Sequence, residues 1–225
     1  MSDLPFDPAE LDAIFFDMDG TLINTDDADA ARWAKRASRV YETPERASRA
    51  GRQIVMSLET PVNGLFTVLD FVGLDTPAVR LLIALKGGTD QQDSIPPIDG
   101  VPDMVRRLAE RYRIGIVSTR TAAESDRYTQ KMGIRDQIAV IAGRDTTWRI
   151  KPHPQPIKWA ARQLGLDPMR VLMVGDTTVD VKAGIRSGAW VCAVLCGYGR
   201  RTELDRAGAD LILDTTAELA DRLLA

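Results

Sequence analysis

The stretch AIFFDMDGTL, residues 13–22, decides the fold expected for this chain. Its first four residues are all apolar, a pattern typical of a strand buried on both faces of a parallel sheet. Two carboxylates, Asp17 and Asp19, follow at once, and Gly20 and Thr21 come next. Carboxylates that close together repel one another and are costly to bury unless a positive charge lies among them. We therefore expect a functional site at the end of this strand.

Length and composition restrict the class of function. The chain has 225 residues, 44% of them hydrophobic and 27% charged, with a formal net charge of -3. These values are ordinary for a soluble globular protein and suit one domain, or a core with a small inserted domain. The sequence has no basic stripe, which argues against nucleic acid and anionic membranes as partners. The N-terminus does not resemble a signal peptide and no apolar run is long enough to span a membrane, so we expect a cytoplasmic protein.

Five further short apolar runs, rich in β-branched residues, follow the first one along the chain. They are IGIVST (114–119), IAVIAG (138–143), VLMVGD (171–176), VCAVLCG (191–197) and DLILD (210–214). Stretches with helical patterns separate these runs. Alternating strands and helices indicate an α/β protein, with a Rossmann-like, doubly wound parallel sheet and right-handed crossovers.

One long region interrupts this alternation. Residues 24–96 contain no convincing strand and have helical patterns separated by proline and glycine. We interpret them as an all-helical cap domain, inserted after the first strand, so that residues 1–23 and 97–225 form the α/β core. The apolar stripes of the insert are expected to form its own core rather than a ligand site.

Polar residues gather where the predicted strands end, which is where open α/β sheets bind their ligands. The set comprises Ser118, Thr119 and Arg120 after the second strand, Lys151 in IKPHP, and Asp176 and Asp180 after the fourth strand. Taken singly, each has an ordinary explanation, since an aspartate after a strand often caps a helix or forms a turn. Together on one rim, the acidic oxygens suit Mg²⁺, and a bound Mg²⁺ favours a phosphate group beside it.

Most of these polar residues belong to four short sequence motifs. In chain order, DMDGTL, IVST, KP and GDTTVD resemble the four motifs of the haloacid dehalogenase superfamily. The helical insert after the first motif is similar to that of the phosphoglycolate phosphatase-like and β-phosphoglucomutase-like branch. The resemblance covers nearly the whole chain. It implies a Mg²⁺-dependent phosphatase, a phosphoric monoester hydrolase, which acts as a monomer or homodimer on a small phosphorylated metabolite, with the insert as a lid.

The resemblance also implies a role for each site residue. Asp17 would be the nucleophile that becomes an aspartyl-phosphate, and Asp19 the general acid and base. Asp17, Asp19 and Asp176 would hold Mg²⁺, with Asp19 contributing its backbone carbonyl, while Asp180 would support the lysine or the waters of the metal. The phosphate-binding candidates are Ser118, Thr119, Lys151, Gly20 and Thr21.

A few residues remain outside these motif roles. Arg120, near the rim, and Arg49 and Arg52, in the insert, are candidates for contact with an anionic substrate. His153 is the only histidine and lies beside Lys151, but we expect no catalytic role for it.

Two alternatives to hydrolysis stay open. One is a sugar-phosphate mutase of the same superfamily, and the other is a phosphate-binding module that has lost catalysis. Mutases of this superfamily typically lack the second aspartate of the last motif, which is Asp180 here. Inactive relatives usually lack one of the motif carboxylates, and all of them are present in this sequence. The hydrolase is therefore the favoured prediction.

Overall fold

The core of the molecule is a parallel sheet with the first strand of the chain near its centre. A computed structural model of the chain describes residues 4–25 and 95–225. They form a six-stranded sheet with the order β3-β2-β1-β4-β5-β6, in which all neighbours are parallel. The strands are β1 (Ala13–Phe16), β2 (Arg113–Val117), β3 (Ile138–Ala142), β4 (Val171–Gly175), β5 (Trp190–Val194) and β6 (Leu211–Leu213). The predicted α/β class and parallel sheet are confirmed.

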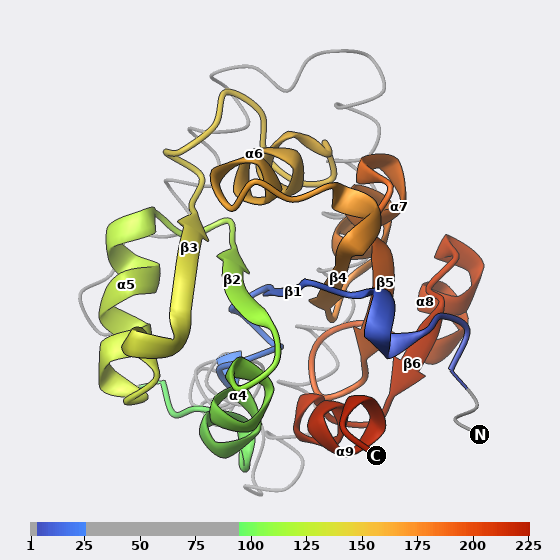
Figure 1. Cartoon of the computed structure of the whole chain (residues 1–225), viewed down its shortest axis with the longest axis horizontal. Helices are drawn as coiled ribbons and strands as arrows, with labels where there is room; N and C mark the ends of the chain where they lie inside the picture. Colours follow the sequence, from blue (N-terminus) through green and yellow to red (C-terminus); the bar gives the residue numbers. More distant parts are fainter. Residues whose placement is uncertain (1–3, 26–94) are drawn as a thin grey trace, which may run out of the picture.

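Helices cover both faces of this sheet, with α6 and α7 on one side and α4 and α9 on the other (Figure 1). The helices are α4 (Val101–Ala109), α5 (Ala122–Lys131), α6 (Gln155–Gln163), α7 (Thr178–Ser187), α8 (Arg201–Ala207) and α9 (Leu219–Leu223). Because side chains alternate along a strand, Ile14 and Phe16 pack in the cluster that includes α4 and α9. Phe15 packs in the cluster that includes α6.

Local sequence signals determine where several helices begin and where α5 ends. Pro102 lies in the first turn of α4, where its missing N–H costs no helical hydrogen bond. Thr121 and Glu124 form a reciprocal capping box at the start of α5. Gly133, just after α5, has φ of 65°, a left-handed conformation that favours glycine.

The register of β1 determines where the chain leaves the sheet. Phe16 pairs with Ile116 of β2 and with Val174 of β4, and the amide of Asp17 donates to the carbonyl of Val174 at 2.9 Å. The residues that follow β1, β2 and β4 therefore emerge side by side at one edge. A shift of one residue would turn every side chain of β1 to the opposite face.

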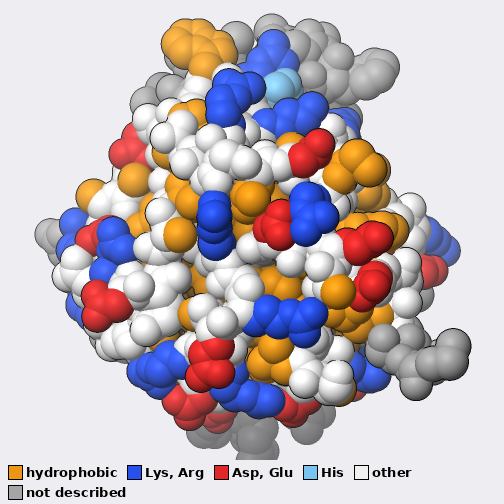
Figure 2. Space-filling model, in the orientation of Figure 1, with side chains coloured by type: hydrophobic (Ala, Val, Ile, Leu, Met, Phe, Trp, Pro, Cys, Tyr) orange, Lys and Arg blue, Asp and Glu red, His pale blue; other side chains and the backbone are white. Residues whose placement is uncertain are grey.

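The predicted cap, residues 24–96, lies almost entirely outside the described residues, so its boundaries and helical nature stay predictions. Among residues 4–25 and 95–225, no helix combines the length and the apolar character needed to cross a membrane. On the face shown in Figure 2, lysine and arginine side chains are mixed with aspartate and glutamate side chains over the middle and lower part, and several basic side chains lie together beside the histidine at the upper edge.

The sheet interior should respond sharply to lost volume. Ile116 is fully buried in β2. Replacing it with alanine leaves a cavity, and we expect Ile116→Ala to lower the free energy of unfolding by about 2–5 kcal/mol. Ile116→Val removes one methylene and should cost only about 0.5–1.5 kcal/mol. Urea unfolding measures both values. Equal losses in the two variants would contradict tight packing at this position.

Candidate active site

A buried lysine links two aspartates at the edge where the strands end. The Nζ atom of Lys151 lies 2.8 Å from Oδ1 of Asp17 and 2.6 Å from Oδ1 of Asp180. Lys151 comes from the loop between β3 and α6, Asp17 directly follows β1, and Asp180 lies in the first turn of α7. The other oxygen of Asp180 accepts hydrogen bonds from the amide and hydroxyl of Thr177, at 3.1 and 2.7 Å. The cap of α7 therefore also fixes the partner of the lysine.

Burial changes the proton affinities of this group. Burial raises the pKa of Asp17 to about 7, Asp180 and Asp19 add to the rise, and the Lys151 ammonium opposes it. Burial acts to lower the pKa of Lys151, but the two carboxylates beside it raise that pKa overall. Lys151 thus stays a cation. An additional positive charge near Asp17 would be needed to keep its carboxylate fully ionised at neutral pH.

Asp176 is fully buried in a cradle built mainly from backbone. The hydroxyl of Thr21 donates to its Oδ1 at 3.3 Å, and the amide of Tyr198 donates to its Oδ2 at 2.8 Å. A Cβ atom added at Gly20 would lie 2.4 Å from Oδ2 of Asp176, and one added at Gly197 would lie 2.1 Å from it. Both positions require glycine because the carboxylate occupies the space that a side chain would need.

Asp19 faces an arginine at the end of the neighbouring strand. The Nε of Arg120 donates to Oδ2 of Asp19 at 2.8 Å, and its Nη2 donates to Oδ1 at 2.6 Å. The amide of Arg120 donates to the hydroxyl oxygen of Ser118 at 3.1 Å. The first strand's second carboxylate is therefore joined to the polar turn after β2.

Three carboxylates come close enough to bind one metal ion. One oxygen from each of Asp17, Asp176 and Asp180 lies within 4.8 Å of the other two, and all three residues are buried. Oxygen donors of this kind suit a hard cation such as Mg²⁺. Both oxygens of Asp180 already accept hydrogen bonds, from Lys151 and from Thr177. Both oxygens of Asp176 accept hydrogen bonds as well, from Thr21 and from Tyr198, so hydrogen bonding alone does not single out the ligands among the three.

The formal charges of the site residues also favour a bound metal ion. The groups brought together are the carboxylates of Asp17, Asp19, Asp176 and Asp180 and the cations of Lys151 and Arg120. With all four acids ionised, four negative charges face two positive ones, which leaves two negative charges uncompensated. A divalent cation would neutralise them, and the donor set therefore fits a metal site.

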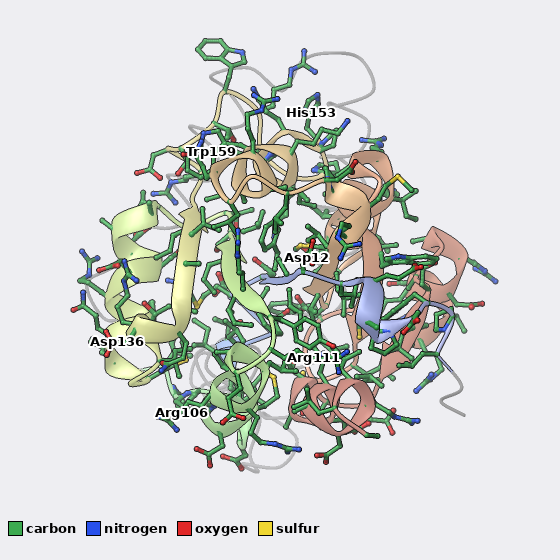
Figure 3. All side chains as sticks on the ribbon, in the orientation of Figure 1. Asp12, Arg106, Arg111, Asp136, His153 and Trp159 are labelled. Atoms are coloured by element: carbon green, nitrogen blue, oxygen red, sulfur yellow. The ribbon has the colours of Figure 1, made fainter. Side chains whose placement is uncertain are left out.

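The structure brings together most residues that the motifs predicted. Those at the rim are Asp17, Asp19, Gly20, Thr21, Ser118, Arg120, Lys151, Asp176 and Asp180. Thr119 lies beside Ser118 and is half-buried. Arg49 and Arg52 lie outside the described residues. His153 lies near the start of α6 (Figure 3), where its Nδ1 accepts a hydrogen bond from the amide of Gln155 at 3.1 Å.

Sequence reasoning missed two parts of the site. The first is the loop that follows β5, whose Gly197 and Tyr198 enclose Asp176. The pair of glycines around Tyr198, directly after a predicted strand, was the available signal. The second is Tyr128 of α5, whose ring centroid lies 4.8 Å from the guanidinium carbon of Arg120. Its place in an amphipathic helix gave no hint of that contact.

The sequence profile of a family described as haloacid dehalogenase-like hydrolase matches residues 14–194. The chain belongs to this family. The match spans β1 to β5 and includes all four motifs. The predicted family and the prediction of a hydrolase are confirmed for this haloacid dehalogenase-like protein.

Curated relatives extend over nearly the full length of this haloacid dehalogenase-like hydrolase. The chain is 31% identical to an N-acetylmuramic acid 6-phosphate phosphatase of Pseudomonas aeruginosa, over 95% of each chain. It is 26% identical to the pyrophosphatase PpaX of Halalkalibacterium halodurans, over 94% of this chain and 96% of the relative.

Solved structures share the fold of this haloacid dehalogenase-like hydrolase. A predicted phosphoglycolate phosphatase of Haemophilus somnus has a TM-score of 0.66 at 20% identity, covering 94% of this chain and 97% of that one. A family hydrolase of Deinococcus radiodurans, solved with bound phosphate and sodium, has a TM-score of 0.66 at 23% identity, covering 94% of each chain.

The raised pKa of Asp17 predicts how pH affects the metal-free protein. Folding lifts this pKa from 3.8 to about 7, so between these values the folded state keeps a proton that the unfolded state releases. Stability from this group is therefore present below about pH 4 and lost as the pH rises through about 7. We expect a loss of up to about 4 kcal/mol in the free energy of unfolding.

Denaturant unfolding in chelator from about pH 4 to pH 8, for wild type and Asp17→Asn, isolates this contribution. The variant cannot titrate at position 17, so the difference between the two stability profiles should change across this range. Added Mg²⁺ should recover the wild-type loss at the high-pH end. Parallel profiles in chelator would contradict the raised pKa.

Proposed function

We propose that this hydrolase is a Mg²⁺-dependent phosphatase that removes phosphate from a small phosphorylated metabolite through an aspartyl-phosphate on Asp17. The observation that carries the proposal is the position of Asp17. Its carboxylate is buried at the end of a central strand, 2.8 Å from the Lys151 ammonium and beside the carboxylate of Asp176. Phosphoryl transfer depends on positioning and charge neutralisation, and these groups supply both.

In the first step a carboxylate oxygen of Asp17 attacks phosphorus, and the bond between phosphorus and the leaving oxygen breaks. Asp19 gives its proton to that leaving oxygen. The Lys151 ammonium and the Ser118 hydroxyl hold oxygens of the transferring phosphoryl group and stabilise its charge. Asp180 keeps the ammonium in place through its 2.6 Å contact.

In the second step water attacks the aspartyl-phosphate. Asp19, now ionised, takes a proton from the water, and the bond between phosphorus and Asp17 breaks to release inorganic phosphate, which returns Asp17 to its carboxylate and Asp19 to its protonated form. Mg²⁺, held by Asp17 and Asp176, would neutralise charge on the phosphoryl oxygens. Thr21 and the Tyr198 amide hold Asp176 in the orientation needed for a ligand.

The relatives support a phosphorylated substrate and suggest two kinds of leaving group. One relative is named for a sugar-acid phosphate monoester and another for pyrophosphate. Either substrate presents a phosphoryl group that the rim around Asp17 could receive. We therefore propose a small phosphate compound as substrate, without nucleic acid or membrane as a partner.

Loss of the nucleophile provides the first test of function. Asp17→Asn keeps the shape of the side chain and removes its nucleophilic charge, so phosphate release should fall by at least about three orders of magnitude. The control is Asp12→Asn, at the opposite end of β1, where Asp12 pairs with Arg170 (Figure 3). This control should keep nearly full activity. Near-normal turnover by a folded Asp17→Asn protein would exclude the mechanism.

Metal dependence provides the second test. Chelator should abolish phosphate release by wild type, and added Mg²⁺ should restore it. Asp176→Ala should lower activity and remove the response to Mg²⁺, because a buried ligand and its charge are lost. Calcium should replace magnesium poorly, since its coordination is larger and looser. Full activity in chelator would show that the acidic cluster has another role.

A substrate panel in ¹⁸O-labelled water would identify the reaction and the leaving group. The panel should contain N-acetylmuramic acid 6-phosphate, pyrophosphate, phosphoglycolate and β-glucose 1-phosphate. We expect inorganic phosphate that carries the label with every accepted compound, because water is the second acceptor. Conversion of β-glucose 1-phosphate to glucose 6-phosphate faster than phosphate release would favour a mutase instead.

A further inference from the structure

Arg120 holds the carboxylate of Asp19 in a two-point grip. Its Nε and Nη2 donate to different oxygens of the same carboxylate, at 2.8 and 2.6 Å. The planar guanidinium matches the planar carboxylate, so two parallel hydrogen bonds fix both the position and the rotation of Asp19. A lysine could offer only a point charge here.

The arginine is itself held from several sides. Its side chain is only 10% exposed. Its guanidinium carbon lies 4.8 Å from the ring centroid of Tyr128, within reach of a cation–π interaction. Its amide donates to Ser118 Oγ, and its carbonyl accepts from the amide of Arg144 at 2.8 Å. These contacts hold the arginine in one orientation before substrate binds. A mobile arginine would instead lose side-chain entropy each time it fixed the position of Asp19. The contacts therefore suit Arg120 to the role of positioning another side chain.

We propose that Arg120 is a positioning residue that acts through Asp19 and orients its carboxylate toward the leaving oxygen and the attacking water. The proposal rests on the proposed function, since it assumes that Asp19 exchanges protons with the reacting oxygens. Each grip bond uses one lone pair of an Asp19 oxygen and leaves others available. Arginine does not give up its own proton in proteins, so Asp19 exchanges protons with the substrate and water and not with its partner.

This role predicts an effect that depends on the leaving group. A leaving oxygen that departs easily as an anion needs little help from a proton donor, whereas a more basic one needs a well-placed donor. Misplacing Asp19 should therefore slow poor leaving groups more than good ones. A residue that only binds the substrate's transferring phosphate would affect both to the same extent.

The test measures kcat/KM for a series of ring-substituted phenyl phosphates, from p-nitrophenyl to p-methoxyphenyl, with Mg²⁺ present. The parameter kcat/KM reports steps up to formation of the aspartyl-phosphate, so the later hydrolysis does not obscure it. For Arg120→Met we expect a loss within about tenfold for p-nitrophenyl phosphate, growing to about a hundredfold for the least acidic phenol. Wild type should depend less steeply on leaving-group acidity.

Two further variants separate the effect of the two-point contact from the effect of the positive charge, and from any folding defect of Arg120→Met. Arg120→Lys keeps the positive charge without the fork, so its dependence should be steeper than wild type but less steep than in Arg120→Met. Tyr128→Leu removes the ring beneath Arg120 and should steepen the dependence slightly. If Arg120→Met does not fold, these two variants decide the question. If Arg120→Lys showed the same leaving-group dependence as wild type, the two-point contact of the guanidinium with Asp19 would not be required.

Arg106→Met is the matched control. Arg106 lies on α4 (Figure 3). It pairs with Asp103 at 2.6 Å, as close as the pair of Arg120 and Asp19. Its removal should leave the leaving-group dependence unchanged. Equal losses for every ester in Arg120→Met, with an active wild type, would overturn only this inference and indicate substrate binding by Arg120. An inactive wild type, or an active Asp17→Asn protein, would overturn the proposed function and this inference with it.

Discussion

The Lys151 ammonium, enclosed between the carboxylates of Asp17 and Asp180, is the constraint on which the site depends. Burying three charges costs a large desolvation free energy, which is recovered only when the geometry of their contacts is good. The 2.6 Å hydrogen bond from the ammonium to Asp180 meets that requirement, and an ion pair at 2.8 Å joins the ammonium to Asp17. They also require that a central strand, a loop after an edge strand and the first turn of a helix meet at one point. The strand order of the sheet, with β1 between β2 and β4, makes this meeting possible.

The same crowding explains why glycine recurs around the acids. A Cβ atom added at Gly175 would lie 2.3 Å from the Cβ of Asp180. The backbone therefore approaches the carboxylates where side chains usually keep it away. A backbone this close lets main-chain amides serve as hydrogen-bond donors to the carboxylates. Asp176 accepts such a hydrogen bond from the Tyr198 amide.

Sequence patterns predicted the sheet well because each strand is marked by a short run of consecutive apolar residues. All six apolar runs became strands, since a continuous run of β-branched residues has few alternatives to a buried strand. Helix ends were less predictable. Residues 216–225 have the pattern of a single helix, but Thr216–Glu218 form a 3₁₀ turn and α9 covers only Leu219–Leu223. Competing caps within a few residues decide such ends, and tertiary contacts choose among them.

The candidate site shows a similar division. Asp17, Lys151, Asp176 and Asp180 were recognisable because side chains of a distinctive chemistry follow strands in a fixed order. The partner of Arg120 was not, because Asp19 lies 101 positions away and many acids could have paired with that arginine. Backbone donors such as the Tyr198 amide are invisible to any pattern of side chains. Reading them required the path of the chain in space.

The grip on Asp176 by a main-chain amide has a consequence for how this loop can diverge. The N–H of position 198 is the same for every residue except proline, so the side chain there can change without loss of the hydrogen bond. Its neighbours have no such freedom, because a Cβ at Gly197 or Gly199 would lie 2.1 or 2.0 Å from atoms of Asp176. Two positions that require glycine thus flank one position, beside Asp176, at which the side chain can change. Substitutions at position 198 can therefore change the side chain at the rim of the site while the hydrogen bond that holds Asp176 is kept.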